Sequence, residues 1–113
     1  MARRGGNEIV TISWRDIPAQ VNCRSGEVKH QVILPRRFQK AIDRAAMVAD
    51  KKTASEYVAE WRRVATPLDT ESVLTDAAQT EADRLEAAFP IERLDEYVAT
   101  GGWNPDRPHH ERI

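Results

Sequence analysis

The sequence has a single cysteine, Cys23, and its 113 residues contain no apolar run near the ~20 residues that a membrane-spanning helix needs. A lone cysteine forms no internal disulfide, which excludes a disulfide-stapled scaffold and agrees with a reducing compartment. Residues 1–7 hold two arginines, but no apolar segment or cleavage pattern of a secretory signal follows them. We therefore expect a cytoplasmic protein without membrane contact and a disordered arm at 1–7.

Metal-binding and nucleophile motifs are also missing. A closed zinc site needs about four ligands at characteristic spacings, and the sequence has neither Cys-x-x-Cys nor His-x-x-x-His. No Gly-x-Ser-x-Gly elbow and no phosphate-binding glycine loop is present. We interpret Cys23 and His30 as core residues rather than as a reactive thiol and a ligand. The adjacent His109 and His110 are the remaining candidates for weak metal binding, and we expect no metal site, no cofactor and no enzyme activity.

Charge is unevenly distributed along the chain, although the net charge is only -1. Residues 1–65 hold 13 Lys and Arg against 7 Asp and Glu, whereas residues 66–113 hold 4 against 11. One explanation is that the two halves attract each other within the molecule or are simply solvated. The other is that the basic half faces an acidic partner.

Aromatic residues make up only 6% of the chain, which bears on nucleic-acid binding. Binding to phosphates is favoured by the close cations Arg36, Arg37, Lys40, Arg44, Lys51 and Lys52. A sequence pI near 6.3, the absence of a recognised binding module and the few aromatics for stacking all argue against it. We keep nucleic-acid binding as a third alternative.

Three short segments before residue 35 alternate as strands do. A Ser25-Gly26 hairpin turn would pair Cys23 with Val28 and Val21 with His30, and a loop over 15–18 would place Ile12 opposite Val21. Both turns predict one register and an antiparallel meander with a single apolar side. The side chains expected on that side are Val10, Ile12, Trp14, Ala19, Val21, Cys23, Val28, His30, Val32 and Leu34.

Helices are predicted from Pro35 onward. Proline suits a helix start, and apolar residues recur at helical spacing over 36–49, so this helix should cover the apolar side of the sheet. Thr53-Ala54-Ser55-Glu56 matches a capping box, and the stripe that follows it predicts a helix reaching residue 65. A third helix is expected over 71–89 and a short fourth one between Pro90 and Gly101-Gly102.

The resulting fold class is α+β: a three-stranded antiparallel meander followed by three to four helices that cover one face of the sheet. A chain of this length forms one domain. Within it we expect a βββαα core at 8–66, an acidic helical extension packed on the core at 67–102, and an extended tail at 103–113.

Four stretches resemble a known family: "ISWRDIPAQV" at 12–21, Val32 to Phe38, "AIDRAAM" at 41–47 and "YVAEWRR" at 57–63. They are similar to the small bacterial domain family named "virulence factor", as found at the end of conserved virulence factor C, and the likeness covers about residues 8–66. The family name describes an association and no chemistry. Stand-alone members are similar to small proteins that accompany corrinoid- or folate-dependent methyl-transfer enzymes.

The loop after the first strand has two possible roles, binding to a partner or only reversing the chain. In the second case it is a plain turn in which Asp16 caps its own backbone and Pro18 directs the chain. Arginine and tryptophan are enriched at binding hot spots, however, and loops commonly carry function. We therefore expect a non-catalytic accessory or adaptor domain that binds another protein through this loop and the basic first helix. The residues expected to contact the partner are Trp14, Arg15, Asp16, Gln20, Arg36, Arg37 and Lys40.

Two further possibilities stay open at this stage. The resemblance implies, as an alternative, a small subunit of a corrinoid- or folate-dependent methyl-transfer system, with a methyltransferase subunit as partner and His30 or the tail histidines as contacts. Tyr57, Trp61, Val64 and Phe89 offer more apolar area than one thin helix covers, so a homodimer is the second possibility.

Overall fold

The computed structural model describes residues 7–51, 53–68 and 73–107. Its elements follow in the order β1 (Asn7–Trp14), β2 (Ile17–Ser25), β3 (Val28–Ile33), α1 (Arg36–Val48), α2 (Ala54–Val58), β4 (Trp61–Pro67), α3 (Leu74–Ala88) and α4 (Ile91–Ala99). Strands and helices are both present in one α+β fold, as the sequence predicts.

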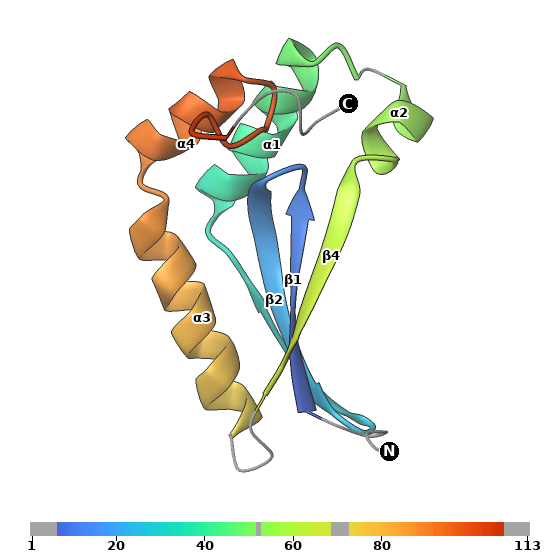
Figure 1. The fold of residues 1–113 in the computed structure, drawn as a ribbon, viewed down its shortest axis with the longest axis vertical. Helices are drawn as coiled ribbons and strands as arrows, with labels where there is room; N and C mark the ends of the chain where they lie inside the picture. Colours follow the sequence, from blue (N-terminus) through green and yellow to red (C-terminus); the bar gives the residue numbers. More distant parts are fainter. Residues whose placement is uncertain (1–6, 52, 69–72, 108–113) are drawn as a thin grey trace.

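The sheet has four antiparallel strands in the order β3-β2-β1-β4 (Figure 1). The first three strands form the expected meander. The expectation of only three strands is wrong, because β4 returns along the free side of β1 and places that strand inside the sheet. Backbone groups that would otherwise lie at the edge of β1 are thereby paired.

The segment of β4 is where the prediction fails most clearly. Thr53 does form the expected capping box with Glu56, but the helix that it begins ends at Val58 instead of near residue 65. Apolar residues at 54, 57, 58, 61, 64 and 65 fit a helical spacing, yet residues 61–67 form a strand. Pairing of Val64 with Thr11 and of Trp61 with Trp14 outweighs this local pattern.

The β2–β3 hairpin keeps its predicted faces but not its predicted pairs. The two residues between the strands are Gly26 and Glu27, with Gly26 at a φ of 59°, instead of Ser25 and Gly26. Cys23 therefore pairs with His30 and Val21 with Val32. A slip of two residues preserves side-chain parity, so Val21, Cys23 and Val32 still share one side of the sheet.

The β1–β2 pairing differs from the prediction by one residue over most of its length. Trp14 pairs with Ile17 and Ser13 with Pro18, but Ile12 pairs with Gln20, because a β-bulge at Ala19 shifts the register. Thr11 consequently lies opposite Val21, the place predicted for Ile12. Val10 and Ile12 are absent from the core cluster that α3 covers, so their predicted place on the covered side is wrong.

Helix α3, rather than α1, is the main helix that packs on the sheet, over β2 and β3. It packs on β2 and β3 through the buried residues Ala78, Ala82 and Leu85, whereas α1 packs chiefly against α4. Figure 1 shows α3 running along one side of the sheet, with α1 and α4 together beyond the end at which β1 meets β2. The thin apolar stripe of α3 is thus fully used.

One hydrophobic core joins the basic and acidic halves. It contains Trp14, Ile17 and Val21 from the sheet, Phe38 and Ile42 from α1, Leu85 from α3, and Leu94, Tyr97 and Val98 from α4. Phe89, after α3, has edge-to-face contacts with both Phe38 and Tyr97. Apolar packing therefore holds the halves together, and the region beyond residue 67 forms part of the core itself.

Residues 103–107 were expected to begin an extended tail, but they form turns against the body of the protein. Helix α4 ends as predicted at the glycine pair, with φ angles of 74° at Gly101 and 101° at Gly102. Within the described residues, no helix combines the length and the apolar composition that crossing a membrane requires.

The small residues of α3 that face the sheet give a first prediction. Ala82 is fully buried, so an Ala82→Leu variant would overpack the α3–sheet contact and lower the free energy of unfolding by about 1–3 kcal/mol. Ala87→Leu, on the exposed side of the same helix, is the control and should change it by no more than about 0.5 kcal/mol. Urea denaturation measures both, and equal effects would contradict the packing described here.

Candidate functional site

The loop predicted as a contact surface is a tight two-residue turn. Because Trp14 pairs with Ile17, only Arg15 and Asp16 lie outside the ladder. Arg15 has a φ of 52°, in the left-handed region that non-glycine residues seldom occupy. Such strain persists where surrounding contacts hold it in place.

Arg15 forms those contacts with segments far away in the sequence. Its Nε donates to Glu60 Oε1 at 3.2 Å and its Nη1 donates to the Gly101 carbonyl at 3.1 Å. The guanidinium also lies 4.7 Å from the centre of the Trp103 ring and 5.2 Å from that of Trp14. Only 11% of the side chain is exposed, so Arg15 acts as an internal bridge.

Asp16 binds the segment after α4. Its backbone amide donates to the Gly102 carbonyl at 2.9 Å, and its Oδ2 accepts from the backbone amide of Asn104 at 2.7 Å. Its Oδ1 lies 3.5 Å from Arg62 Nη1, and the Arg62 guanidinium lies 4.9 Å from the centre of the Trp103 ring. The carboxylate therefore connects β4 with the residues after α4, instead of only capping its own turn.

Trp14 packs in the core beneath Arg15 and Asp16 and supports their turn. It is fully buried, its Nε1 donates to the Tyr57 carbonyl at 2.8 Å, and its ring stacks on Tyr57 at 5.7 Å. A Cβ on Gly102 would lie 2.9 Å from Cζ3 of Trp14, so the indole needs a glycine at this place. We call Arg15, Asp16, Glu60, Arg62 and Trp103 the loop clamp.

The loop clamp changes the meaning of the predicted site. Trp14, Arg15 and Asp16 lie together as expected. Their polar groups, however, bind other segments of this chain: residues 57–62 and the residues after α4. Glu60, Arg62 and Trp103 were not singled out by the sequence analysis, since they are 45 or more residues away from the turn. Gln20 lies apart from the clamp, on the opposite side of the bulge, where it pairs with Ile33.

The three predicted cations of α1 also separate into two groups. Arg37 donates from Nε to the Phe89 carbonyl at 3.2 Å and from Nη2 to the Glu86 carbonyl at 3.0 Å. It therefore binds the unpaired carbonyls at the end of α3. Arg36 and Lys40 are exposed.

One side of the sheet carries a second candidate surface, which we call the open face. In the β-ladders Val10 lies between Asn22 and Ala65, and Asn22 is followed by Gln31, so these side chains share the side opposite to Val21 and Cys23. The side chains of this face are Glu8, Val10, Ile12, Gln20, Asn22, Arg24, Lys29, Gln31, Ile33, Arg63 and Ala65. It is the side that α3 leaves uncovered.

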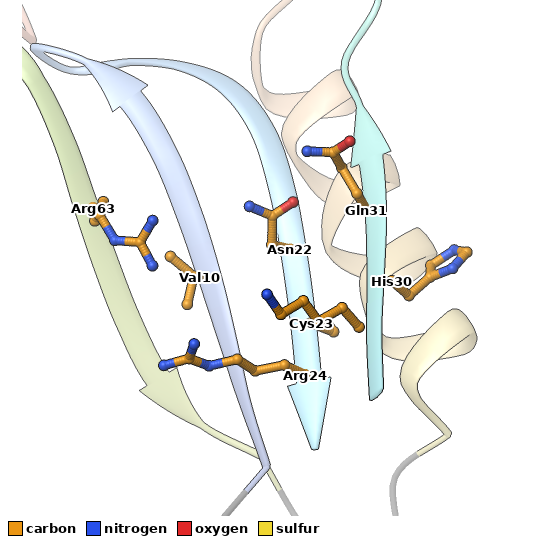
Figure 2. A pocket seen from close by; sticks show the side chains of 8 residues that line it. Val10, Asn22, Cys23, Arg24, His30, Gln31 and Arg63 are labelled. Atoms are coloured by element: carbon orange, nitrogen blue, oxygen red, sulfur yellow. The ribbon is translucent and has the colours of Figure 1, made fainter. Parts of the chain in front are cut away.

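A hollow of about 360 Å³ lies on the open face over β4, β1, β2 and β3. Figure 2 shows Arg63, Val10, Asn22 and Gln31 placed in turn on these neighbouring strands. The nearly buried Val10 forms an apolar floor between polar side chains. The Oδ1 atom of Asn22 is buried and accepts no hydrogen bond from the described residues.

A second hollow of about 370 Å³ lies further along the same face. Its lining includes Ile12, Gln20, Ile33, Gln39 of α1 and the half-buried Trp61. Gln31 Nε2 donates to Gln20 Oε1 at 3.2 Å, which connects the two hollows. Ile33 is 69% exposed, an unusual position for a large aliphatic side chain.

Two titratable candidates of the sequence, Cys23 and His30, pair across β2 and β3 and both line the first hollow, although strand alternation puts their side chains on the side of Val21. Burial raises the pKa of Cys23, and the nearby Glu81 carboxylate raises it further, which disfavours a thiolate. The half-buried His30 lines the edge of the first hollow, and in Figure 2 its ring is directed outward from β3, away from Asn22 and Val10. His109 and His110 lie outside the described residues, and over 7–51, 53–68 and 73–107 no three of His, Cys, Asp and Glu are grouped to hold a metal ion.

The family assignment comes from a comparison of the sequence with protein families. The model of the family described as "Virulence factor" matches residues 12–98, which run from β1 to α4. The chain belongs to the virulence factor family. The match extends well beyond residue 66, where the resemblance was expected to end. No curated protein and no solved structure matches the chain.

The loop clamp predicts a large effect of Arg15 on the stability of this virulence factor domain. Arg15→Ala removes charge-assisted hydrogen bonds and leaves Glu60 without that partner, so the free energy of unfolding should fall by about 2 kcal/mol. The exposed Arg36→Ala is the matched control, with an expected change below about 0.5 kcal/mol. Chemical denaturation measures the free energy of unfolding of both variants. Similar losses for the two would show that the loop clamp contributes little to stability.

The contact between Gly102 and Trp14 gives another prediction for the same domain. Gly102→Ala combines a positive φ with a clash against the indole, so it should destabilise the fold by about 3–4 kcal/mol. Gly26→Ala also has a positive φ but meets no atom within 4 Å, and roughly 1–2 kcal/mol is expected for it. Thermal and urea unfolding compare the pair. A smaller loss for Gly102→Ala than for Gly26→Ala would be inconsistent with this packing.

Proposed function

We propose that this member of the virulence factor family is a non-catalytic accessory domain that binds another protein through the open face of its sheet and the adjoining exposed side of α1. Of the contact residues predicted from the sequence, this proposal keeps Gln20 of the open face and the exposed Arg36 and Lys40 of α1. Trp14, Arg15 and Asp16 support it from within, because their polar groups are used inside the molecule.

The observation that carries this proposal is the contrast between the two sides of the sheet. On the side with Val21 and Cys23, α3 packs over β2 and β3, whereas the open face has two adjoining hollows and exposed apolar and basic side chains. The exposed Ile33 and the half-buried Trp61 line the second hollow and make it apolar, and the cations Arg24, Lys29 and Arg63 line the first hollow next to it. Apolar centres with polar rims are typical of protein-binding surfaces.

The charge distribution supports the same proposal. Arg44 pairs with Asp95 between the basic and acidic halves, but both side chains are largely exposed. Arg15, Arg24 and Arg62 pair with carboxylates of their own half. Exposed pairs contribute only about 0–1 kcal/mol each, so attraction between the halves explains little of the charge segregation. A partner for the basic side is the better explanation.

Site-specific photocrosslinking in the native host tests the proposal. A benzophenone amino acid at Gln20 or at Lys40 should give a covalent adduct with one discrete protein, because both positions border the proposed contact surface. The same amino acid at Asp83, on the exposed side of α3, is the control and should give no such adduct. The purified partner should then bind the purified domain in calorimetry. Adducts from Asp83 alone, or from none of the three positions, would refute this contact surface.

A further inference from the structure

We infer that the open face binds an extended acidic segment of its partner, with an apolar side chain of that segment in the hollow beside Trp61. This inference rests on the proposed function, since it takes the partner to be a protein. It adds the chemistry and the conformation of the segment that is bound.

Charge is the first reason. Three cations, Arg24, Lys29 and Arg63, stand on the open face, and its acidic residue Glu8 already pairs with Arg24. Within the described part of the chain, Lys29 and Arg63 form no ion pair. Their positive potential favours a segment of the opposite sign and steers its approach.

The spacing of the two hollows is the second reason. The Asn22–Gln31 pair lines the first hollow, and the Gln20–Ile33 pair, two residues further along the strands, lines the second. Two residues along a strand span about 7 Å. An extended peptide repeats its side chains on one side at the same distance, so an acidic residue at position i and an apolar residue at i+2 can enter neighbouring hollows.

Hydrogen bonding favours a polypeptide over a nucleic acid. The buried Oδ1 of Asn22 accepts no hydrogen bond from the described residues, and a rotation of this amide would bring it to a donor in the hollow. A peptide presents a backbone N–H at nearly every residue, whereas the N–H donors of a nucleic acid lie on its bases and not along its phosphodiester backbone. Single-stranded nucleic acids also depend on aromatic side chains for stacking, and the half-buried Trp61 is the one aromatic residue that lines these two hollows.

Fluorescence anisotropy with defined peptides tests the inference. The probe is a fluorescein-labelled Ser-Asp-Ser-Leu-Ser-Asp-Ser peptide, which places Asp and Leu on one side of an extended chain. Two matched peptides replace Asp by Lys or Leu by Ser, and a labelled dT12 oligonucleotide represents nucleic acid. We expect saturable binding of the Asp-Leu peptide, weaker binding when Leu is replaced, and none when Asp is replaced.

Charge-reversal variants locate the binding. Arg63→Glu should raise the dissociation constant of the Asp-Leu peptide about tenfold, because it reverses a charge beside the first hollow. Arg84→Glu makes the same change in net charge on α3, away from the open face, and should leave the affinity within about twofold. Circular dichroism checks that both variants keep their fold, and Lys29→Glu replaces Arg63→Glu if that variant does not fold.

Each contrary outcome overturns the inference in its own way. Tighter binding of dT12 than of the Asp-Leu peptide would assign the face to nucleic acid, and equal losses in Arg63→Glu and Arg84→Glu would indicate non-specific attraction. Absence of peptide binding would refute the acidic segment. If Gln20 still crosslinks to a discrete protein in that case, the proposed function stands and only its acidic, extended partner segment fails.

Discussion

The structure depends on one nearly buried cation. Arg15 sits in a two-residue turn with a positive φ, and its guanidinium binds Glu60 before β4, the carbonyl of Gly101 after α4, and the ring of Trp103. A charged group at this depth requires compensating partners. These partners come from two later parts of the chain, so the contacts with β4 and with the residues after α4 stabilise the backbone geometry of the turn. Asp16 adds a second set of bonds to the same two segments.

The end of the sheet and its two faces therefore differ in what covers them. The end of the sheet at the loop clamp is occupied by α1, α4 and the turns after α4. On one face, α3 packs over β2 and β3 through side chains as small as Ala78 and Ala82. The opposite face is the one that no described helix covers along its length, although α1 contributes Gln39 to its second hollow. The segregation of charge follows this geometry, because the acidic α3 and the basic open face lie on opposite sides of one sheet.

Local rules predicted what depends on local contacts. The capping box at Thr53, the helix ends at Pro90 and Gly101, and the shared side of Val21, Cys23 and Val32 all follow from nearby residues or from side-chain parity. Strand β4 was missed because Trp61, Val64 and Ala65 also fit a helical spacing, and pairing with β1, some 50 residues away, decides between the two structures. The loop was identified as important, but its role was not predictable, since the partners of Arg15 lie 45 and 86 residues further along. No feature near residue 103 connects Trp103 with that turn.

A single extra residue determines the composition of the open face. If the pairing of Trp14 with Ile17 continued without interruption, Val10 would lie opposite Val21, on the side that α3 covers. The bulge at Ala19 reverses this parity, so Thr11 lies opposite Val21, and Val10 and Ile12 join Asn22 and Gln20 on the other side. The open face thereby gains an apolar floor beneath its amides and cations, which a surface for binding a peptide requires. β-Bulges often re-aim side chains near functional sites. Here the bulge lies between the end of the sheet that carries the loop clamp and the face that we assign to binding.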